Sequence, residues 1–167
     1  SHAAPENTLS AFNRAWQEGA DGIEGDFYLT KDERIVCIHD RNTKKLAQQN
    51  LDVTQSTLAE LKQLDVGSWK NKRFSGERIP TLEEVLATIP PGGKIFIEIK
   101  DGERIVSHLK QVLEKTPVRP EQVRIIAFSM EVLRACKAQL PGIQASWLVD
   151  KKYLDRETLP GVLHTAK

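Results

Sequence analysis

The 167-residue chain lacks the features that mark several classes of protein. Its only cysteines, Cys37 and Cys136, do not have the spacing of a metal-binding motif, so we expect buried free thiols. No apolar run approaches the ~20 residues that a membrane-spanning helix needs. The net charge is +1, which gives no electrostatic reason to expect nucleic acid or an acidic membrane as a partner. A hydrophobic content of 40% is instead typical of a globular domain with a substantial core.

Two carboxylates, Glu24 and Asp26, stand at alternate positions of a short strand-like segment. Side chains two apart on a strand point to the same face, about 6.6 Å apart along it. Two like charges at that distance repel each other, and inside a sheet they also lose hydration. A divalent cation between them would resolve both problems. The segment 94–100 has the same spacing of charged side chains, with Glu98 and Lys100 on one face.

The position of the charges along each segment indicates the kind of sheet. Apolar residues 35–38 precede His39, and apolar residues 95–97 precede Glu98; residues 125–128 form a similar apolar run. Strands that are apolar on both faces and end in functional groups are typical of a parallel α/β barrel, whose active site lies at the C-terminal ends of its strands. The expected fold class is therefore α/β, as a TIM-type (β/α)8 barrel.

The apolar segments predict about six strands, the last of them over residues 144–149. A (β/α)8 barrel needs eight strands and typically ~250 residues. We therefore predict a single barrel domain over residues 1–167 that is incomplete at both ends. Residues 40–80 form a long, polar excursion, and excursions of this length in a compact domain are often functional. We expect this segment to be a loop or insertion over the active-site face.

Helical periodicity and capping residues predict five helices. Asn7 is the expected N-cap of the first, and Gly19 is suited to its C-terminal end. Two short helices are expected from capping-box patterns, and three longer ones from periodicity. The two short helices are expected to begin at Thr57 and Thr81. The three longer helices are expected over residues 8–18, 103–115 and 131–140.

The link between the Glu24 segment and the His39 segment allows two topologies. It is short for a parallel connection, which normally takes a dozen or more residues. The alternative is a hairpin with its turn centred near Asp32, which would pair His39 with Gly25. Both topologies place His39 beside the carboxylates.

Seven ordered motifs carry a resemblance to a known family. They are Pro5-Glu6-Asn7-Thr8, Glu24-Gly25-Asp26, Thr30-Lys31-Asp32, His39-Asp40, Gly67-Ser68-Trp69, Ile79-Pro80-Thr81-Leu82 and Glu98-Ile99-Lys100. Over essentially its whole length the chain resembles a glycerophosphodiester phosphodiesterase. The resemblance implies a βα barrel that binds a divalent metal and hydrolyses glycerophosphodiesters to sn-glycerol 3-phosphate and an alcohol.

The resemblance also implies roles for individual residues. Glu24, Asp26 and Glu98 stand at the metal-ligand positions of the family. His39 stands at one of its two catalytic histidines, and Lys100 at a residue close to the phosphate. The other histidine of the family belongs to a His-Arg-Gly motif a few residues before Pro-Glu-Asn-Thr, and the sequence begins inside that gap.

The residue types agree with this chemistry. All-oxygen ligation suits Mg²⁺ or Ca²⁺, and such an ion would neutralise a phosphodiester and polarise its P–O bonds. Lys100 would add a fixed positive charge at the phosphoryl oxygens. His39 can act as general acid or general base, because imidazole exchanges protons near neutral pH. The nucleophile, a substrate hydroxyl or a water, is left open. Glu6 is expected to hold the first loop through hydrogen bonds, behind the residues that contact the metal.

Two other functions stay open. A phospholipase acting on lysophospholipids or phosphoinositides would share the barrel, but residues 40–80 show no clear apolar rim for a lipid. A non-catalytic module that holds a phosphate ligand becomes the better interpretation if the upstream histidine is truly absent.

The expected partner is a small-molecule glycerophosphodiester, with no nucleic acid and no integral membrane segment. A homo-oligomer is left open. Cytoplasm is the default compartment, while periplasm or secretion stays open because any targeting sequence would precede Ser1.

Overall fold

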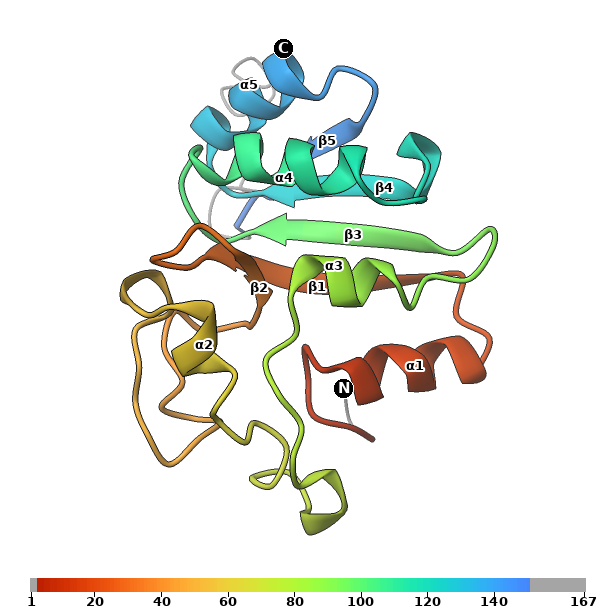
Figure 1. Ribbon diagram of the computed structural model, residues 1–167. Helices are drawn as coiled ribbons and strands as arrows, with labels where there is room; N and C mark the ends of the chain where they lie inside the picture. Colours follow the sequence, from red (N-terminus) through yellow and green to blue (C-terminus); the bar gives the residue numbers. More distant parts are fainter. Residues whose placement is uncertain (1–2, 151–167) are drawn as a thin grey trace.

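The computed structural model describes residues 3–150, which form one five-stranded sheet flanked by helices (Figure 1). The strand order is β2-β1-β3-β4-β5. The strands are β1 (Gly22–Leu29), β2 (Ile35–Cys37), β3 (Lys94–Ile99), β4 (Val123–Ala127) and β5 (Gln144–Trp147). Strands β1, β3, β4 and β5 are parallel, and β2 runs antiparallel to β1 at the edge.

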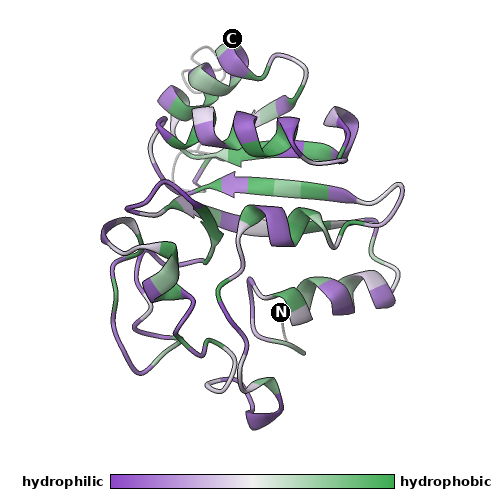
Figure 2. Cartoon of the chain, in the orientation of Figure 1, coloured by the Kyte–Doolittle hydropathy of each residue, from purple (hydrophilic) through white to green (hydrophobic). Residues whose placement is uncertain are grey.

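Four helices cover one face of the sheet. They are α1 (Leu9–Gln17), α3 (Leu82–Leu86), α4 (Ile105–Glu114) and α5 (Met130–Gln139). Their apolar sides share one buried cluster with alternate strand residues such as Phe27, Ile97 and Ile125. Figure 2 shows the strands as largely hydrophobic and the helices as banded, which is the pattern of helices with one buried side. Burial of each large aliphatic or aromatic side chain contributes roughly 1.5–3 kcal/mol to folding.

The opposite face of the sheet carries the polar groups. In β1, Ile23 and Phe27 point into the helix-covered core, so Glu24 and Asp26 point to the other face. The register places Asp26 of β1 beside Glu98 of β3. On this face Phe96 keeps 40% of its surface exposed. The arrangement therefore brings carboxylates from the interior of β1 together with one near the C-terminal end of the adjacent parallel strand β3.

Residues 40–80 are a packed unit rather than an open loop. They contain the helix α2 (Leu58–Leu61) and the 3-10 turns η1 (Val53–Gln55) and η2 (Lys72–Phe74). Val53, Leu61 and Ile79 form a second buried cluster with Tyr28 and Val36 of the sheet. Figure 1 shows this unit at the side of the molecule to which the arrowheads of β3 and β4 point. The excursion is thus fixed to the sheet beside the ends of the strands.

Asp65 organises the turn at the far end of this unit. Its carboxylate accepts hydrogen bonds from the backbone N–H groups of Gly67, Ser68 and Gly76, each at 2.9 Å. These bonds hold the pKa of Asp65 far below its usual range. At Gly67 a Cβ would lie 2.0 Å from the carbonyl oxygen of Phe74, so only glycine fits there.

The hairpin topology is correct for the second strand. Phe27 pairs with Cys37 and Leu29 with Ile35 across a turn around Asp32, and continuing this register places His39 opposite Gly25. Residues 3–150 form five strands, beside an expected count of about six for residues 1–167. Residues 151–167 of the predicted domain lie outside the described residues.

The helix predictions are confirmed, with one correction. Thr57 and Thr81 each form a capping box, with Glu60 and Glu84 respectively. The N-cap of α1, however, is Thr8, whose hydroxyl accepts from the N–H of Ala11. Asn7 has a left-handed backbone instead (φ 54°), which turns its side chain away from the helix.

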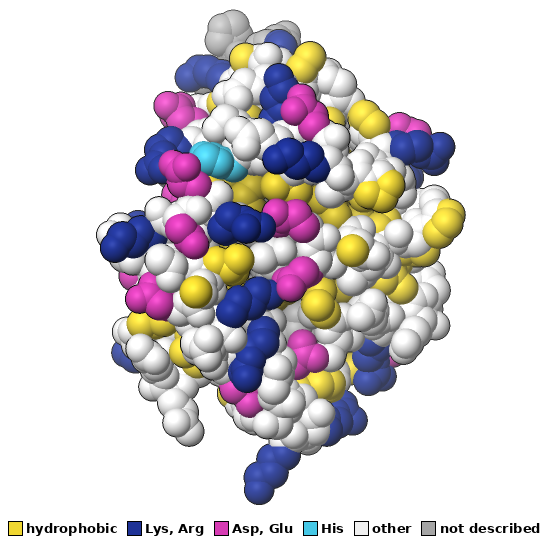
Figure 3. All heavy atoms as spheres, viewed as in Figure 1, with side chains coloured by type: hydrophobic (Ala, Val, Ile, Leu, Met, Phe, Trp, Pro, Cys, Tyr) yellow, Lys and Arg dark blue, Asp and Glu magenta, His cyan; other side chains and the backbone are white. Residues whose placement is uncertain are grey.

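Two further predictions concern composition. Cys37 and Cys136 are both free and buried, as expected. Among the described residues no helix is long and apolar enough to cross a membrane. Cationic and anionic side chains are interspersed over the face seen in Figure 3, in keeping with the net charge of +1.

Candidate active site

Three carboxylates gather on one face of the sheet, two from the interior of β1 and one from the C-terminal end of β3. Glu24, Asp26 and Glu98 each offer a carboxylate oxygen, and these atoms lie within 4.8 Å of one another. Asp26 is only 5% exposed, whereas Glu24 keeps an exposed surface. A set of oxygen donors at this spacing suits a hard divalent cation such as Mg²⁺ or Ca²⁺.

The electrostatics of the cluster show that it lacks positive charge. The pKa of Glu24 is raised from its ordinary 4.5 to about 7, first by partial loss of hydration and then by the negative charges of Asp26 and Glu98. Lys100 and His39 oppose this shift without cancelling it. Near neutral pH the cluster therefore retains a proton on Glu24 for part of the time, unless a cation balances the charge. This excess of negative charge is what a resident divalent metal would compensate.

Lys100, directly after β3, bridges the two strands. Its Nζ lies 2.9 Å from Glu98 Oε1 and 3.4 Å from Asp26 Oδ1. Burial alone would lower the pKa of Lys100, but the hydrogen bond to Glu98 and the charges of Asp26 and Glu98 outweigh it and raise the pKa. The ammonium therefore stays charged at neutral pH. A phosphate bound in front of the cluster would meet this fixed charge.

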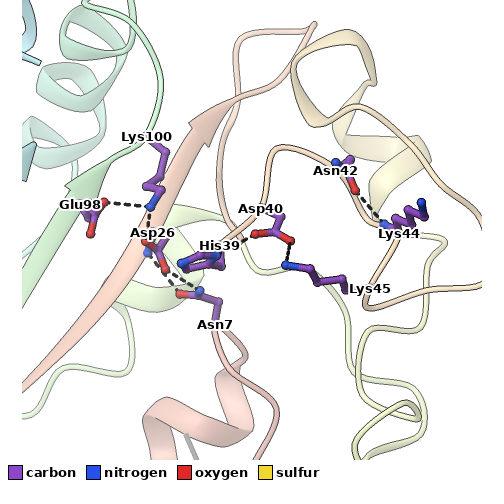
Figure 4. Close-up of polar contacts among 9 residues, drawn as sticks. All are labelled: Asn7, Asp26, His39, Asp40, Asn42, Lys44, Lys45, Glu98 and Lys100. Carbon is purple, nitrogen blue, oxygen red and sulfur yellow. Dashed lines mark hydrogen bonds and ion pairs between the residues drawn. The ribbon is translucent and has the colours of Figure 1, made fainter. Parts of the chain in front are cut away.

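His39 lies just beyond β2, with its side chain 54% exposed. Its Nδ1 is 2.9 Å from Asp40 Oδ1, and Asp40 Oδ2 is 2.6 Å from Lys45 Nζ (Figure 4). The hydrogen bond from Lys45, followed by that from His39, lowers the pKa of Asp40. A carboxylate at Nδ1 favours the tautomer with the proton on that nitrogen, which leaves Nε2 free to exchange a proton with a ligand.

Three of these groups line an open pocket of about 430 Å³. Glu24, Asp26 and His39 lie on its wall together with Glu6 and Asn7. A larger hollow of about 650 Å³, between residues 45–49 and 63–69, has no comparable set of converging carboxylates. Volume alone therefore does not mark the site, whereas the carboxylate cluster does.

The role expected of Glu6, behind the residues that contact the metal, stays a prediction. Its side chain is exposed on the pocket wall, and its negative charge contributes to the raised pKa of Lys45, behind the larger effect of Asp40. The loop is also held by Thr8, whose hydroxyl donates to the Pro5 carbonyl, and by the side chain of Asn7.

Two residues of the site had no expected functional role. Asp40 orients His39. The sequence feature that could have indicated this role is the position of Asp40 next to that histidine. Asn7 contacts Asp26 through both its amide nitrogen and its amide oxygen. The sequence feature that could have indicated this contact is the Pro5–Thr8 motif, but an N-cap was the simpler interpretation of Asn7 there.

Comparison with known proteins gives the family. The model of the "Glycerophosphoryl diester phosphodiesterase family" matches residues 1–162. The glycerophosphodiester phosphodiesterase of Caldanaerobacter subterraneus is 41% identical over 150 residues, which cover 86% of this chain and 61% of that protein. The glycerophosphodiester phosphodiesterase of Bacillus subtilis is 31% identical over 166 residues, covering 90% and 57%. The chain thus spans about three fifths of the length of these relatives.

Solved structures agree. An Oleispira antarctica phosphodiesterase, in complex with the product sn-glycerol-3-phosphate, matches with a TM-score of 0.87 and 29% identity, over 98% of this chain and 68% of that one. The Thermotoga maritima glycerophosphodiester phosphodiesterase matches with a TM-score of 0.72 and 26% identity, over 96% and 64%. The described sheet is thus an open, five-stranded part of a TIM-type barrel, as the fold prediction expected. The chain belongs to the glycerophosphoryl diester phosphodiesterase family.

Proposed function

We propose that the protein is a metal-dependent phosphoric diester hydrolase that converts glycerophosphodiesters to sn-glycerol 3-phosphate and an alcohol. The observation that carries this proposal is the convergence of Glu24, Asp26 and Glu98, with Lys100 beside them, on one face of β1 and β3. The names of the relatives and the product bound to the Oleispira antarctica enzyme support the substrate class.

Glu24, Asp26 and Glu98 would hold Mg²⁺ or Ca²⁺. The pKa of Glu24, raised first by burial and then by the charges of Asp26 and Glu98, fits a site for a cation. A bound divalent ion supplies positive charge that neutralises the phosphodiester and polarises its P–O bonds. Lys100, held between Asp26 and Glu98, adds a second positive charge where the phosphoryl oxygens would lie.

His39 is the proposed proton-transfer group. Hydrolysis needs one group to take a proton from the nucleophile and another to protonate the leaving alkoxide. His39 supplies one of these two transfers through Nε2, since Nδ1 faces Asp40. The exposure of His39 on the pocket wall leaves room for a substrate to reach that nitrogen.

An assay with glycerophosphocholine tests the proposal. Purified protein with Mg²⁺ or Ca²⁺ should release sn-glycerol 3-phosphate, detected by a coupled dehydrogenase, and excess EDTA should stop the release. Full activity in excess EDTA would contradict the metal requirement. Parallel assays with lysophosphatidylcholine and a phosphoinositide separate the phospholipase alternative. Binding of sn-glycerol 3-phosphate without turnover of any substrate would favour the non-catalytic module.

A further inference from the structure

Asn7 adopts a conformation that frees its side chain from the helix it precedes. Its φ of 54° lies in the left-handed region, which asparagine tolerates better than most residues. Thr8 caps α1, and its hydroxyl also donates to the Pro5 carbonyl at 2.7 Å. The helix start is therefore satisfied without Asn7, whose amide reaches across to the sheet.

The amide of Asn7 makes three contacts with the sheet. Its Nδ2 donates to Asp26 Oδ2 at 2.9 Å. Its Oδ1 accepts from the backbone N–H of Asp26 at 3.2 Å and from the thiol of Cys37 at 3.1 Å. The reversed amide would set oxygen against a carboxylate and nitrogen against an N–H group, so these partners fix its orientation. Figure 4 shows Asn7 against Asp26, opposite Lys100.

These contacts restrict the carboxylate of Asp26. Its Oδ2 is held by Asn7, and its Oδ1 lies 3.4 Å from Lys100. The terminal torsion of aspartate is otherwise broad. Because Asp26 is only 5% exposed, solvent has little access to orient it instead.

We propose that Asn7 is a positioning residue: its amide fixes the rotation of the Asp26 carboxylate, so that Oδ1 faces the cation-binding side of the cluster. The inference rests on the proposed metal-dependent function, because the preset carboxylate matters through the metal that it would bind. Partners that orient a ligand in this way typically change metal affinity about 10–100-fold when they are removed.

A purely structural role for Asn7 would be to hold the first loop. The chain offers a matched control, because Thr8 fastens the same loop through Pro5 and α1. Loss of the Thr8 hydroxyl should weaken the loop and leave Asp26 with its amide partner. Metal affinity, rather than stability, therefore separates the two roles.

The experiment is calorimetric titration of the purified protein with MgCl2 or CaCl2 alone, without substrate, together with thermal melts. Asn7→Gly keeps the left-handed backbone and removes the amide; its metal affinity should fall about 10–100-fold. Thr8→Ala should lower the melting temperature and leave metal affinity unchanged within error. A folded Asn7→Gly protein with unaltered metal affinity would overturn the inference, as would an equal loss of affinity in Thr8→Ala.

The outcomes distinguish this inference from the proposed function. If the unaltered protein binds neither metal, the proposed function fails first. If it binds metal and Asn7→Gly binds as tightly, only the role of Asn7 fails. Should Asn7→Gly not fold, NMR of the unaltered protein decides: the side-chain amide protons of Asn7 should exchange slowly and shift on addition of Mg²⁺. Exchange as fast as that of exposed Asn50 would contradict the proposal.

Discussion

Carboxylates in two regions of this molecule have opposite surroundings. On one face of β1 and β3, carboxylate oxygens of Glu24, Asp26 and Glu98 lie within 4.8 Å of one another, with Lys100 in contact with two of these residues. In the 40–80 unit, Asp65 accepts hydrogen bonds from backbone N–H groups of its own turn. The pKa of Glu24 is raised to about 7, whereas the pKa of Asp65 is lowered.

The opposite pKa shifts distinguish a carboxylate that stabilises a turn, Asp65, from one that belongs to a candidate binding site, Glu24. Asp65 is stabilised as an anion by the fold, so its charge is already used to hold a turn. In the cluster, Glu24 is destabilised as an anion by burial and by the charges of Asp26 and Glu98, so a cation would be favoured there. Conflicting charges of this kind are concentrated at functional sites. The following predictions test that contrast, from the largest expected effect to the smallest.

Asp26→Ala should abolish metal binding and phosphodiesterase activity, because it removes the central, buried carboxylate of the cluster. It should affect folding little, since it also relieves the repulsion with Glu24. Metal titration, the glycerophosphocholine assay and a thermal melt measure the three quantities. A variant that retains metal affinity would show that the cluster is not the binding site.

His39→Ala should lower kcat by roughly 10²–10⁴, the usual range for loss of a general acid or base. Metal affinity should stay nearly intact, because His39 lies outside the carboxylate cluster. Steady-state kinetics and metal titration on the same preparation separate the two effects. Loss of metal binding in this variant would mean that His39 is a ligand rather than a proton-transfer group.

The pH dependence of stability should differ between the two regions. Without metal, a Glu24 pKa raised from 4.5 to about 7 contributes stability that is full below pH 4.5 and is lost as pH rises to about 7. The lowered pKa of Asp65 contributes stability above its ordinary 3.8, which is lost as pH falls below that value. Thermal melts of the metal-free protein between pH 3 and 8, compared with those of Glu24→Gln and Asp65→Asn, show which residue causes each change in stability with pH.

Metal affinity should change over the pH range in which Glu24 loses its proton. Because binding requires Glu24 as an anion, affinity should rise between pH 5 and pH 7 and level off above pH 7. Calorimetry in buffers of different ionisation enthalpy should also detect proton release near neutral pH. An affinity independent of pH across this range would contradict the raised pKa of Glu24.

Asp65→Ala gives the smallest expected effect. It should destabilise the protein by about 1–2 kcal/mol, the cost of losing a carboxylate that caps backbone N–H groups. Metal affinity should be unchanged, because Asp65 belongs to the turn of the 40–80 unit. Urea unfolding gives the first quantity and metal titration the second. A large loss of metal affinity would show that the two regions are not independent.

Local patterns predicted much of this fold. The capping boxes at Thr57 and Thr81 depend on residues three positions apart, so the sequence shows them directly. The position of His39 was also predictable, because both topologies that the short link allowed placed it beside the carboxylates, and the structure has the hairpin. The carboxylate cluster followed from alternation along β1 and from the charged end of β3.

Contacts between distant segments were not predictable in the same way. Asn7 and Thr8 are both good N-caps, and only the left-handed turn at Asn7 gives that role to Thr8. The contact of Asn7 with Asp26 joins residues 19 apart, which no local pattern reveals. The packing of residues 40–80 against the sheet likewise depends on side chains brought together by the fold.

Anomalous X-ray diffraction from crystals of the protein with Mn²⁺, which binds the same hard oxygen ligands as Mg²⁺, tests the central claim most directly. The account predicts a single strong peak with carboxylate oxygens of Glu24, Asp26 and Glu98 as ligands at roughly 2.0–2.6 Å, the range for hard cations. A peak elsewhere, or no peak among these three residues at saturating Mn²⁺, would contradict it.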